Sequence, residues 1–135
     1  MLQHFIINMS INTDLENYKA DCLAILSAKF QSDTKKDQKA DPLEKVVEKY
    51  LNDTVKHLGG LSLKFAPFIL NGIPDRLILL KFGKSAYFEL KRRGKTPTHL
   101  QLERHKQLRE LGYLVYVADS KLSVIECLIN FVKQC

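Results

Sequence analysis

The stretch RLILLKFGKSAYFELK, residues 76–91, decides the fold of this chain. Its first half, Arg76 to Phe82, is a nearly continuous apolar run, which is typical of a strand buried on both faces. Gly83-Lys84 indicates a tight turn, and Ala86 to Lys91 fits a second strand. We therefore predict a β-hairpin in the middle of the domain.

The region before the hairpin predicts one helix and one linker ahead of the main domain. Apolar residues recur at three- and four-residue steps from Asp14 to Phe30, with Thr13 or Asp14 as the cap. The polar run Gln31 to Asp41 is typical of a flexible linker. We therefore divide the chain into residues 1–40, a helical extension with a charged linker, and residues 41–135, the main domain.

The main domain is expected to begin with a helix and a strand. Asp41 favours a helix N-cap, Pro42 fits the first turn, and Gly59-Gly60 ends the helix after Leu58. Its inner face is predicted to consist of four apolar residues at helical spacing, Val47, Leu51, Val55 and Leu58. The following stretch LSLKFAPF, residues 61–68, alternates like a strand that breaks at Pro67.

The region after the hairpin predicts a helix, a strand and a final helix. Thr98 caps the first of these helices, which runs to about Leu111 and ends at Gly112. A strand from Tyr113 to Ala118 and a helix from Leu122 to Val132 follow. The order predicts an α/β fold in which a mixed four-stranded sheet is flanked by helices, with a right-handed crossover and one extra N-terminal helix.

The composition favours an intracellular, cytoplasmic or nuclear protein with an anionic partner. The net charge is +6 and the sequence pI is about 9.2, so nucleic acid is the first expectation and an anionic membrane the second. Cys22, Cys127 and Cys135 are far apart and suit reduced thiols better than a disulfide or zinc framework. No apolar stretch has the length of a membrane span, and the N-terminus lacks signal-peptide features.

Two acids and a lysine are expected to meet where the hairpin strands end. Asp75 precedes the first strand and Glu89 lies near the end of the second, so antiparallel pairing brings them together. Glu89 and Lys91 share one face because side chains alternate along a strand. Two facing carboxylates are tolerated when a divalent cation lies between them, and oxygen ligands suit Mg²⁺ or Mn²⁺. The backbone carbonyl of Leu90 is a candidate third ligand.

These motifs resemble the PD-(D/E)xK nuclease superfamily and, within it, the VRR-NUC family. The resemblance covers about Asp41 to Ser120. It is carried by a series of motifs in a fixed order: Glu44 in a helix, Gly59-Gly60, Lys64-Phe65, Gly72-Ile73-Pro74-Asp75-Arg76, Glu89-Leu90-Lys91, Pro97, Gln101 and Gly112-Tyr113. It implies a restriction-endonuclease-like core with the element order helix, three strands, helix, strand.

The resemblance also implies a role for each matched residue. Asp75 and Glu89 are the expected metal ligands, Lys91 the catalytic lysine, and Gln101 a residue that orients Lys91 or the substrate. Glu44 is expected to bind the metal directly or through water, although Glu48, one turn later, remains an alternative. The residues expected to contact DNA are Lys64, Arg76, Arg92, Arg93 and Lys95. His57, His99 and His105 share no metal-binding spacing and are interpreted as surface residues.

The expected function is that of a deoxyribonuclease that uses Mg²⁺ or Mn²⁺ and no nucleotide cofactor. The resemblance implies an endonuclease that prefers branched, flapped or Holliday-junction DNA, acts as a homodimer and is encoded by a virus or phage. No base-reading motif is present in the sequence, which agrees with recognition of DNA structure. The alternatives are an inactive DNA-binding module of the same fold and a nuclease that cuts unstructured single- or double-stranded DNA.

Overall fold

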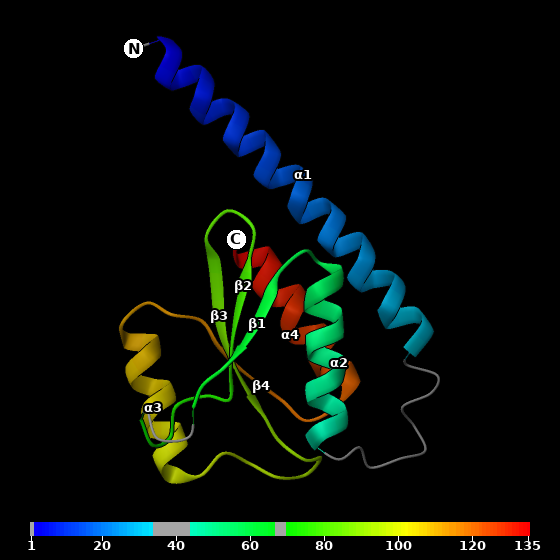
Figure 1. Cartoon of the computed structure of the whole chain (residues 1–135), viewed down its shortest axis with the longest axis vertical. Coiled ribbons are helices and arrows are strands. Elements are labelled where there is room, and N and C mark those ends of the chain that lie inside the picture. The colour runs from blue at the N-terminus through cyan, green and yellow to red at the C-terminus, as the bar shows by residue number, and fades with distance from the viewer. Residues whose placement is uncertain (1, 34–43, 67–69) are drawn as a thin grey trace.

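The computed structural model describes residues 2–33, 44–66 and 70–135 (Figure 1). Its elements in chain order are α1 (Leu2–Asp33), α2 (Glu44–His57), β1 (Leu61–Lys64), β2 (Arg76–Leu80), β3 (Lys84–Leu90), α3 (His99–Glu110), β4 (Val115–Ala118) and α4 (Lys121–Gln134). The strands form one sheet in the order β1-β2-β3-β4. The first three strands are antiparallel, and β4 pairs parallel to β3 after the crossover through α3. The mixed four-stranded sheet flanked by helices is therefore confirmed.

The predicted hairpin forms, but its turn lies earlier than expected. Residues 81–83 make the turn, and β2 therefore ends at Leu80 instead of Phe82. Phe82 and Gly83 both have positive φ angles, 63° and 68°, and this tight reversal is what starts β3 at Lys84. The prediction that β2 is buried on both faces is wrong, since Ile78 and Leu80 on one face are buried while Leu77 and Leu79 on the other are only half-buried.

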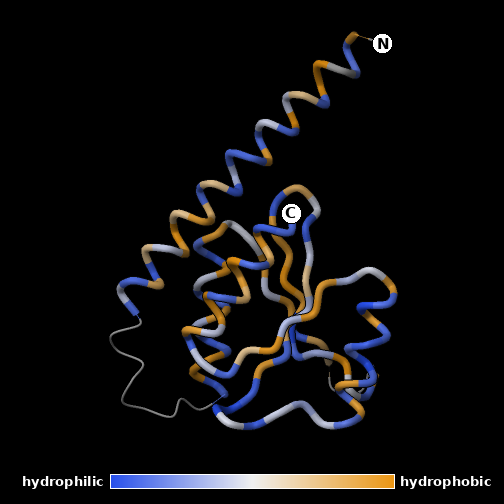
Figure 2. The backbone as a smooth tube through the Cα atoms, turned by 180° about the vertical axis from the view of Figure 1, so that it is seen from behind, coloured by the Kyte–Doolittle hydropathy of each residue, from blue (hydrophilic) through white to orange (hydrophobic). Residues whose placement is uncertain are grey.

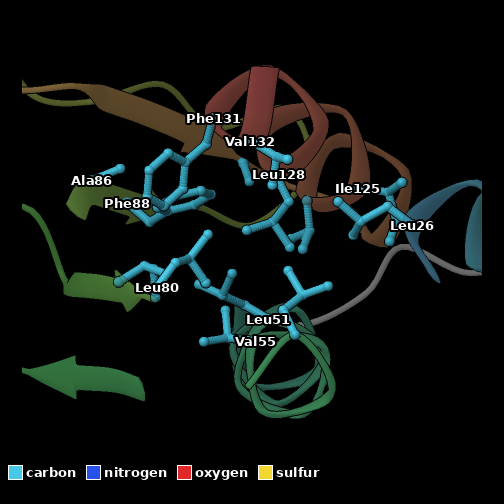
Figure 3. Close-up of a cluster of buried hydrophobic side chains, with 14 of the residues drawn as sticks. Leu26, Leu51, Val55, Leu80, Ala86, Phe88, Ile125, Leu128, Phe131 and Val132 are labelled. Atoms are coloured by element: carbon cyan, nitrogen blue, oxygen red, sulfur yellow. The ribbon is translucent and has the colours of Figure 1, made fainter. Parts of the chain in front are cut away.

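The core lies on one face of the sheet, under α2 and α4 (Figure 3). Val47, Leu51, Val55 and Leu58 of the first domain helix are all buried, as predicted. Figure 3 shows Leu51 and Val55 facing Leu80 of β2, while Leu128 and Phe131 of α4 approach Phe88 of β3 from the other side. This packing fixes both strands of the hairpin against a rigid layer.

Helix α1 is longer than the sequence predicted. The predicted start at Asp14 is wrong because residues 2–13 contain no glycine or proline and continue the helix. Thr13 does not cap it, since its hydroxyl donates to the carbonyl of Met9 at 2.9 Å within the helix. At the other end Gln31 to Asp33 are helical, so the linker predicted to begin at Gln31 does not begin there.

The two halves of α1 have different environments (Figures 1 and 2). In the second half Cys22 and Leu26 are buried in the core, and the Tyr18 hydroxyl donates to the carbonyl of Leu58 at 2.6 Å. The hydroxyl of Tyr50 donates to Asp33 at the end of the helix. The first half extends away from the domain and exposes five apolar side chains, Leu2, Ile6, Ile7, Met9 and Ile11.

The remaining boundaries agree with the sequence or lie outside the described residues, except that β1 ends at Lys64, before Phe65 and Ala66, which the predicted strand included. Thr98 caps α3 as predicted, and β4 and α4 differ from their predicted bounds by one or two residues. Asp41, Pro42, Pro67 and the boundary between residues 40 and 41 fall outside the described ranges. Within the described ranges, no helix has the length and apolar character needed to cross a membrane.

Candidate active site

Asp75 and Glu89 lie side by side where the hairpin ends. Arg76 pairs with Phe88, so the residues before and after them, Asp75 and Glu89, face each other across the strands. The Oδ2 atom of Asp75 accepts a hydrogen bond of 2.8 Å from the backbone N–H of Leu90. This bond holds the Asp75 side chain against the third strand. A role for the Leu90 carbonyl as a metal ligand stays a prediction.

The turn before Asp75 is held against α3 by a close backbone approach. Gly72 has a φ of 79°, which favours glycine. A Cβ atom at this position would lie 2.9 Å from the carbonyl oxygen of Leu100 in the first turn of α3. Only glycine therefore fits between the turn that leads to Asp75 and the helix that carries Gln101.

Glu89 is almost completely buried, with 1% of its surface exposed, and polar groups surround its carboxyl group. The Nε2 atom of Gln101 donates to Oε1 at 3.0 Å, and the Nζ atom of Lys91 lies 3.6 Å from the same oxygen. Burial and the neighbouring Asp75 carboxyl raise the pKa of Glu89 to about 8, while Lys91 opposes the shift. The carboxyl pair therefore disfavours two negative charges in the absence of a cation.

Gln101 owes its orientation to the cap of α3. Its Oε1 atom accepts from the backbone N–H of Thr98 at 2.9 Å, and its own N–H donates to the Thr98 hydroxyl at 3.2 Å. This capping box leaves the amide nitrogen directed at Glu89. The structure thus brings Asp75, Glu89, Lys91 and Gln101 together, as the sequence predicted.

A buried histidine also reaches Glu89, and the sequence reading missed it. The expectation that His105 is a surface residue is wrong, because it is 0% exposed and its Nε2 atom lies 3.4 Å from Oε2 of Glu89. Burial, followed by the charges of Arg109 and Lys91, lowers the pKa of His105. Its position four residues after Gln101 places both on one face of α3, a spacing that was visible in the sequence.

The structure separates the two candidate acids of α2. Glu44, the acid preferred from the sequence, is the first described residue of α2, and its side chain is exposed. Glu48, one turn further in, accepts from Nε of Arg76 at 3.1 Å and from Lys64 at 3.2 Å. Arg76 lowers the pKa of Glu48 most strongly. Glu48 is therefore linked to the residue next to Asp75, whereas Glu44 is not brought to this cluster.

The five predicted DNA contacts have different surroundings. The Arg76 side chain is 13% exposed and bound to Glu48, so contact with DNA would require it to leave this partner. Lys64 also contacts Glu48, but it is 63% exposed and lines a cavity of about 220 Å³ that Asp75 shares. Arg92, Arg93 and Lys95 are exposed on a turn directly after Lys91, closed by a 2.9 Å hydrogen bond from Lys95 N–H to the Arg92 carbonyl.

The donor set fits a hard divalent cation. Carboxylate oxygens from Asp75 and Glu89 and nearby backbone carbonyl groups are the ligands that Mg²⁺ and Mn²⁺ prefer, with water completing the shell. Among the described residues, no three His, Cys, Asp or Glu side chains cluster as a ready-made metal site. A cation here would therefore rely on the two acids together with backbone and water ligands.

Replacing Glu89 by glutamine is expected to remove a pH-dependent loss of stability. Because folding raises the Glu89 pKa from 4.5 to about 8, the contribution of this group to the free energy of unfolding is greatest below pH 4.5 and falls as the pH rises to about 8. Glu89→Gln should therefore be more stable than the wild type at alkaline pH, by up to about 5 kcal/mol, and equal to it near pH 4. Urea unfolding in chelator across this range measures the difference.

Glu48→Gln is the matched control, because its effect on the free energy of unfolding should change with pH in the opposite direction. Folding lowers the Glu48 pKa, so its contribution is present above the usual glutamate pKa and lost as the pH falls. Glu48→Gln should therefore be less stable than the wild type at neutral pH and approach it in acid. A stability difference between wild type and Glu89→Gln that stays constant with pH would contradict the assigned shift.

Known proteins similar to this chain are nucleases. No protein-family model matches the sequence. A protein named "Putative nuclease p44", from Acyrthosiphon pisum secondary endosymbiont phage 1, is 41% identical over 78 residues, which are 58% of this chain and 84% of that protein. A solved structure described as "VRR_NUC domain" aligns with a TM-score of 0.59 and 32% identity, covering 64% of this chain and 94% of that one. With this sequence identity, this coverage and the shared fold, the chain belongs to the VRR-NUC family of nucleases.

Proposed function

We propose that this chain is a deoxyribonuclease that hydrolyses phosphodiester bonds with Mg²⁺ or Mn²⁺. The observation that carries the proposal is the pairing of Asp75 with a buried Glu89, whose pKa is raised to about 8, beside Lys91. A carboxyl pair of this kind is stable with a shared proton or with a divalent cation. In a nuclease family, the second explanation accounts for a buried Glu89 paired with Asp75, and Asp75 itself lines a cavity.

The proposed chemistry divides between the cation and the side chains around it. When bound, the cation activates a water molecule and offsets the charge that develops on the phosphate. Asp75 and Glu89 would hold it, with the Leu90 carbonyl as a third ligand and a helix acid acting directly or through water. The contact of Glu48 with Arg76 favours Glu48 over Glu44 as that acid.

Lys91 and Gln101 are proposed to act on either side of Glu89. The Lys91 side chain is only 16% exposed, so its ammonium charge is weakly screened and attracts a phosphate strongly. Gln101 holds one oxygen of Glu89 through its amide nitrogen, which keeps the carboxyl plane fixed while Lys91 remains available to the phosphate or to the attacking water. The two residues therefore have different proposed roles, although both approach Oε1 of Glu89.

The basic turn after Lys91 is proposed to bind the DNA backbone. Arg93 and Lys95 are exposed, and the turn leaves the sheet directly beside Lys91. Lys64 faces the cavity on the other side of Asp75. Positive groups on both sides of the acid pair would neutralise the phosphates that flank the cut bond.

We further propose that the substrate is branched or flapped DNA, cut by a homodimer of a virus-encoded protein. Similarity to a phage protein supports the viral origin. Support for the dimer comes from Leu2, Ile6 and Met9, which recur at four- and three-residue steps on the projecting half of α1 and are more than half exposed. A second copy of the helix would cover this stripe, and a two-fold dimer presents two active sites to two strands.

Asp75→Ala is expected to abolish cleavage while preserving DNA binding. Removing a proposed cation ligand should reduce the cleavage rate by about 1000-fold or more, and the lost negative charge should leave DNA affinity equal or higher. The measurement is cleavage and binding of labelled duplex, single strand, 5′ flap, splayed arm and four-way junction, with Mn²⁺ and with chelator. The exposed Asp53→Ala, on α2, is the matched control and should cut normally.

The ranking of these substrates tests the preference for DNA structure. Faster cutting of flap or junction than of plain duplex supports it, and equal cutting of all substrates contradicts it. Binding without cutting on every substrate and at every metal concentration would indicate an inactive DNA-binding module instead.

The double variant Arg93→Ala, Lys95→Ala is expected to weaken DNA binding by a similar factor for every DNA sequence. Loss of two phosphate contacts should reduce the slope of log affinity against log salt concentration by about 2. Fluorescence anisotropy with a labelled junction at several salt concentrations measures the slope. Lys133→Ala, an exposed lysine on α4, serves as the control. An unchanged slope would remove the basic turn from the DNA interface.

Ile6→Asp combined with Met9→Asp is expected to convert the proposed dimer into a monomer. In the dimer, the two carboxylates on the apolar stripe would be buried without partners. The free energy that this costs exceeds what the contact between two helices provides. Light scattering after size exclusion measures the mass of the intact chain. Asn8→Asp with Asn12→Asp adds the same charge beside the stripe and should leave the mass unchanged. A monomeric wild type would contradict the dimer.

A further inference from the structure

His105 is a buried polar residue with an unequal environment at its two ring nitrogens. Its side chain comes from the middle of α3 and is 0% exposed. The Nε2 atom lies 3.4 Å from Oε2 of Glu89. The Nδ1 atom is buried and has no hydrogen-bond partner among the described residues. A histidine that served only to fill space would not need to direct one nitrogen at a carboxyl group.

The contacts of Glu89 divide between its two oxygens. Oε1 is approached by Gln101 at 3.0 Å and by Lys91 at 3.6 Å. Oε2 is approached by His105. Since Gln101 and His105 are one helical turn apart on α3, this helix holds the buried carboxyl group at both ends.

We propose that His105 is a positioning residue that donates a hydrogen bond from Nε2 to Glu89 and so fixes the orientation of this carboxyl group toward a divalent cation. The hydrogen bond between His105 and Glu89 is independent of the proposed function, whereas its effect on cation binding rests on the proposed cation site. A carboxylate bonded at one oxygen can still turn about its terminal torsion, which has a broad energy profile. Contacts at both oxygens remove this freedom before a cation arrives.

The unpartnered Nδ1 atom determines which tautomer agrees with the proposal. A neutral imidazole carries one N–H group and one bare acceptor nitrogen. An N–H buried at Nδ1 without an acceptor would lose a full hydrogen bond, whereas a bare lone pair there costs less. The tautomer protonated at Nε2 therefore places the only N–H where an acceptor exists, at Glu89.

The proposal predicts a graded series of His105 variants. Glutamine can place an amide nitrogen near the position of Nε2, whereas asparagine is too short and leucine only fills the space. Residues that orient metal ligands typically contribute about 10- to 100-fold to metal affinity. His105→Leu and His105→Asn should therefore lose about 10-fold or more in Mn²⁺ affinity, and His105→Gln should recover most of the loss. Titration calorimetry with Mn²⁺ alone measures the affinity, and thermal unfolding reports the fold of each variant.

His99→Leu is the matched control, since His99 is an exposed histidine on the same helix and should leave the Mn²⁺ affinity unchanged. If His105→Leu binds Mn²⁺ like the wild type, or His105→Gln loses as much affinity as His105→Leu, the positioning role is overturned and His105 is a packing residue. Should the leucine variant fail to fold, the comparison of glutamine with asparagine gives the same decision.

A metal-free measurement separates this inference from the proposed function. In the metal-free chain with ¹⁵N-labelled histidine, NMR should show His105 protonated at Nε2, and Glu89→Gln should change its resonance. Protonation at Nδ1, or no response to Glu89→Gln, would overturn the contact whatever the chain does with metal. A wild type that binds no Mn²⁺ while its His105 shows the Nε2 proton would overturn the cation site and leave the contact standing.

Discussion

The burial of the Glu89 carboxyl group is the constraint on which the rest of the site depends. A carboxyl group with 1% exposure is costly unless its oxygens have partners, and these partners are Lys91, directly after β3, and side chains of α3. The crossover helix is therefore more than a connection between β3 and β4. It supplies Gln101 and His105, and its N-terminal cap at Thr98 sets the direction of the first of these side chains.

The opposite face of the sheet supplies the rigidity that this arrangement needs. Ile78 and Phe88 alternate with the site residues along the hairpin and are completely buried. Their packing against α2 and α4 fixes the strand register, and the register is what places Asp75 opposite Glu89. The second half of α1 extends the same core through Cys22 and Leu26, although it lies outside the region that resembles the family.

Local signals in the sequence predicted most of the fold and the centre of the site. Thr98, Gly59-Gly60 and the alternation in β3 act over a few residues, so their consequences could be read directly.

The sequence was a poorer guide where tertiary contacts determine the position of a residue. The sequence could not separate Glu44 from Glu48 because the two share a helix face, and the contact of Glu48 with Arg76 is a tertiary one. His105 was misjudged although its four-residue spacing from Gln101 places both on one face of α3. Its burial and its contact with Glu89 depend on tertiary packing. The early start of α1 was missed because the apolar spacing used to place the helix reflects its buried face, whereas Leu2, Ile6 and Ile11 are exposed.

The tight fit at Gly72 makes the geometry of the acid pair depend on a helix that carries neither acid. The turn leading to Asp75 touches the first turn of α3 with no space for even one methyl group, and the same helix holds Glu89 through Gln101. A displacement of α3 would therefore shift the surroundings of both carboxyl groups together. The distance between the two acids therefore depends on the position of α3 as well as on the hairpin that precedes it in the chain.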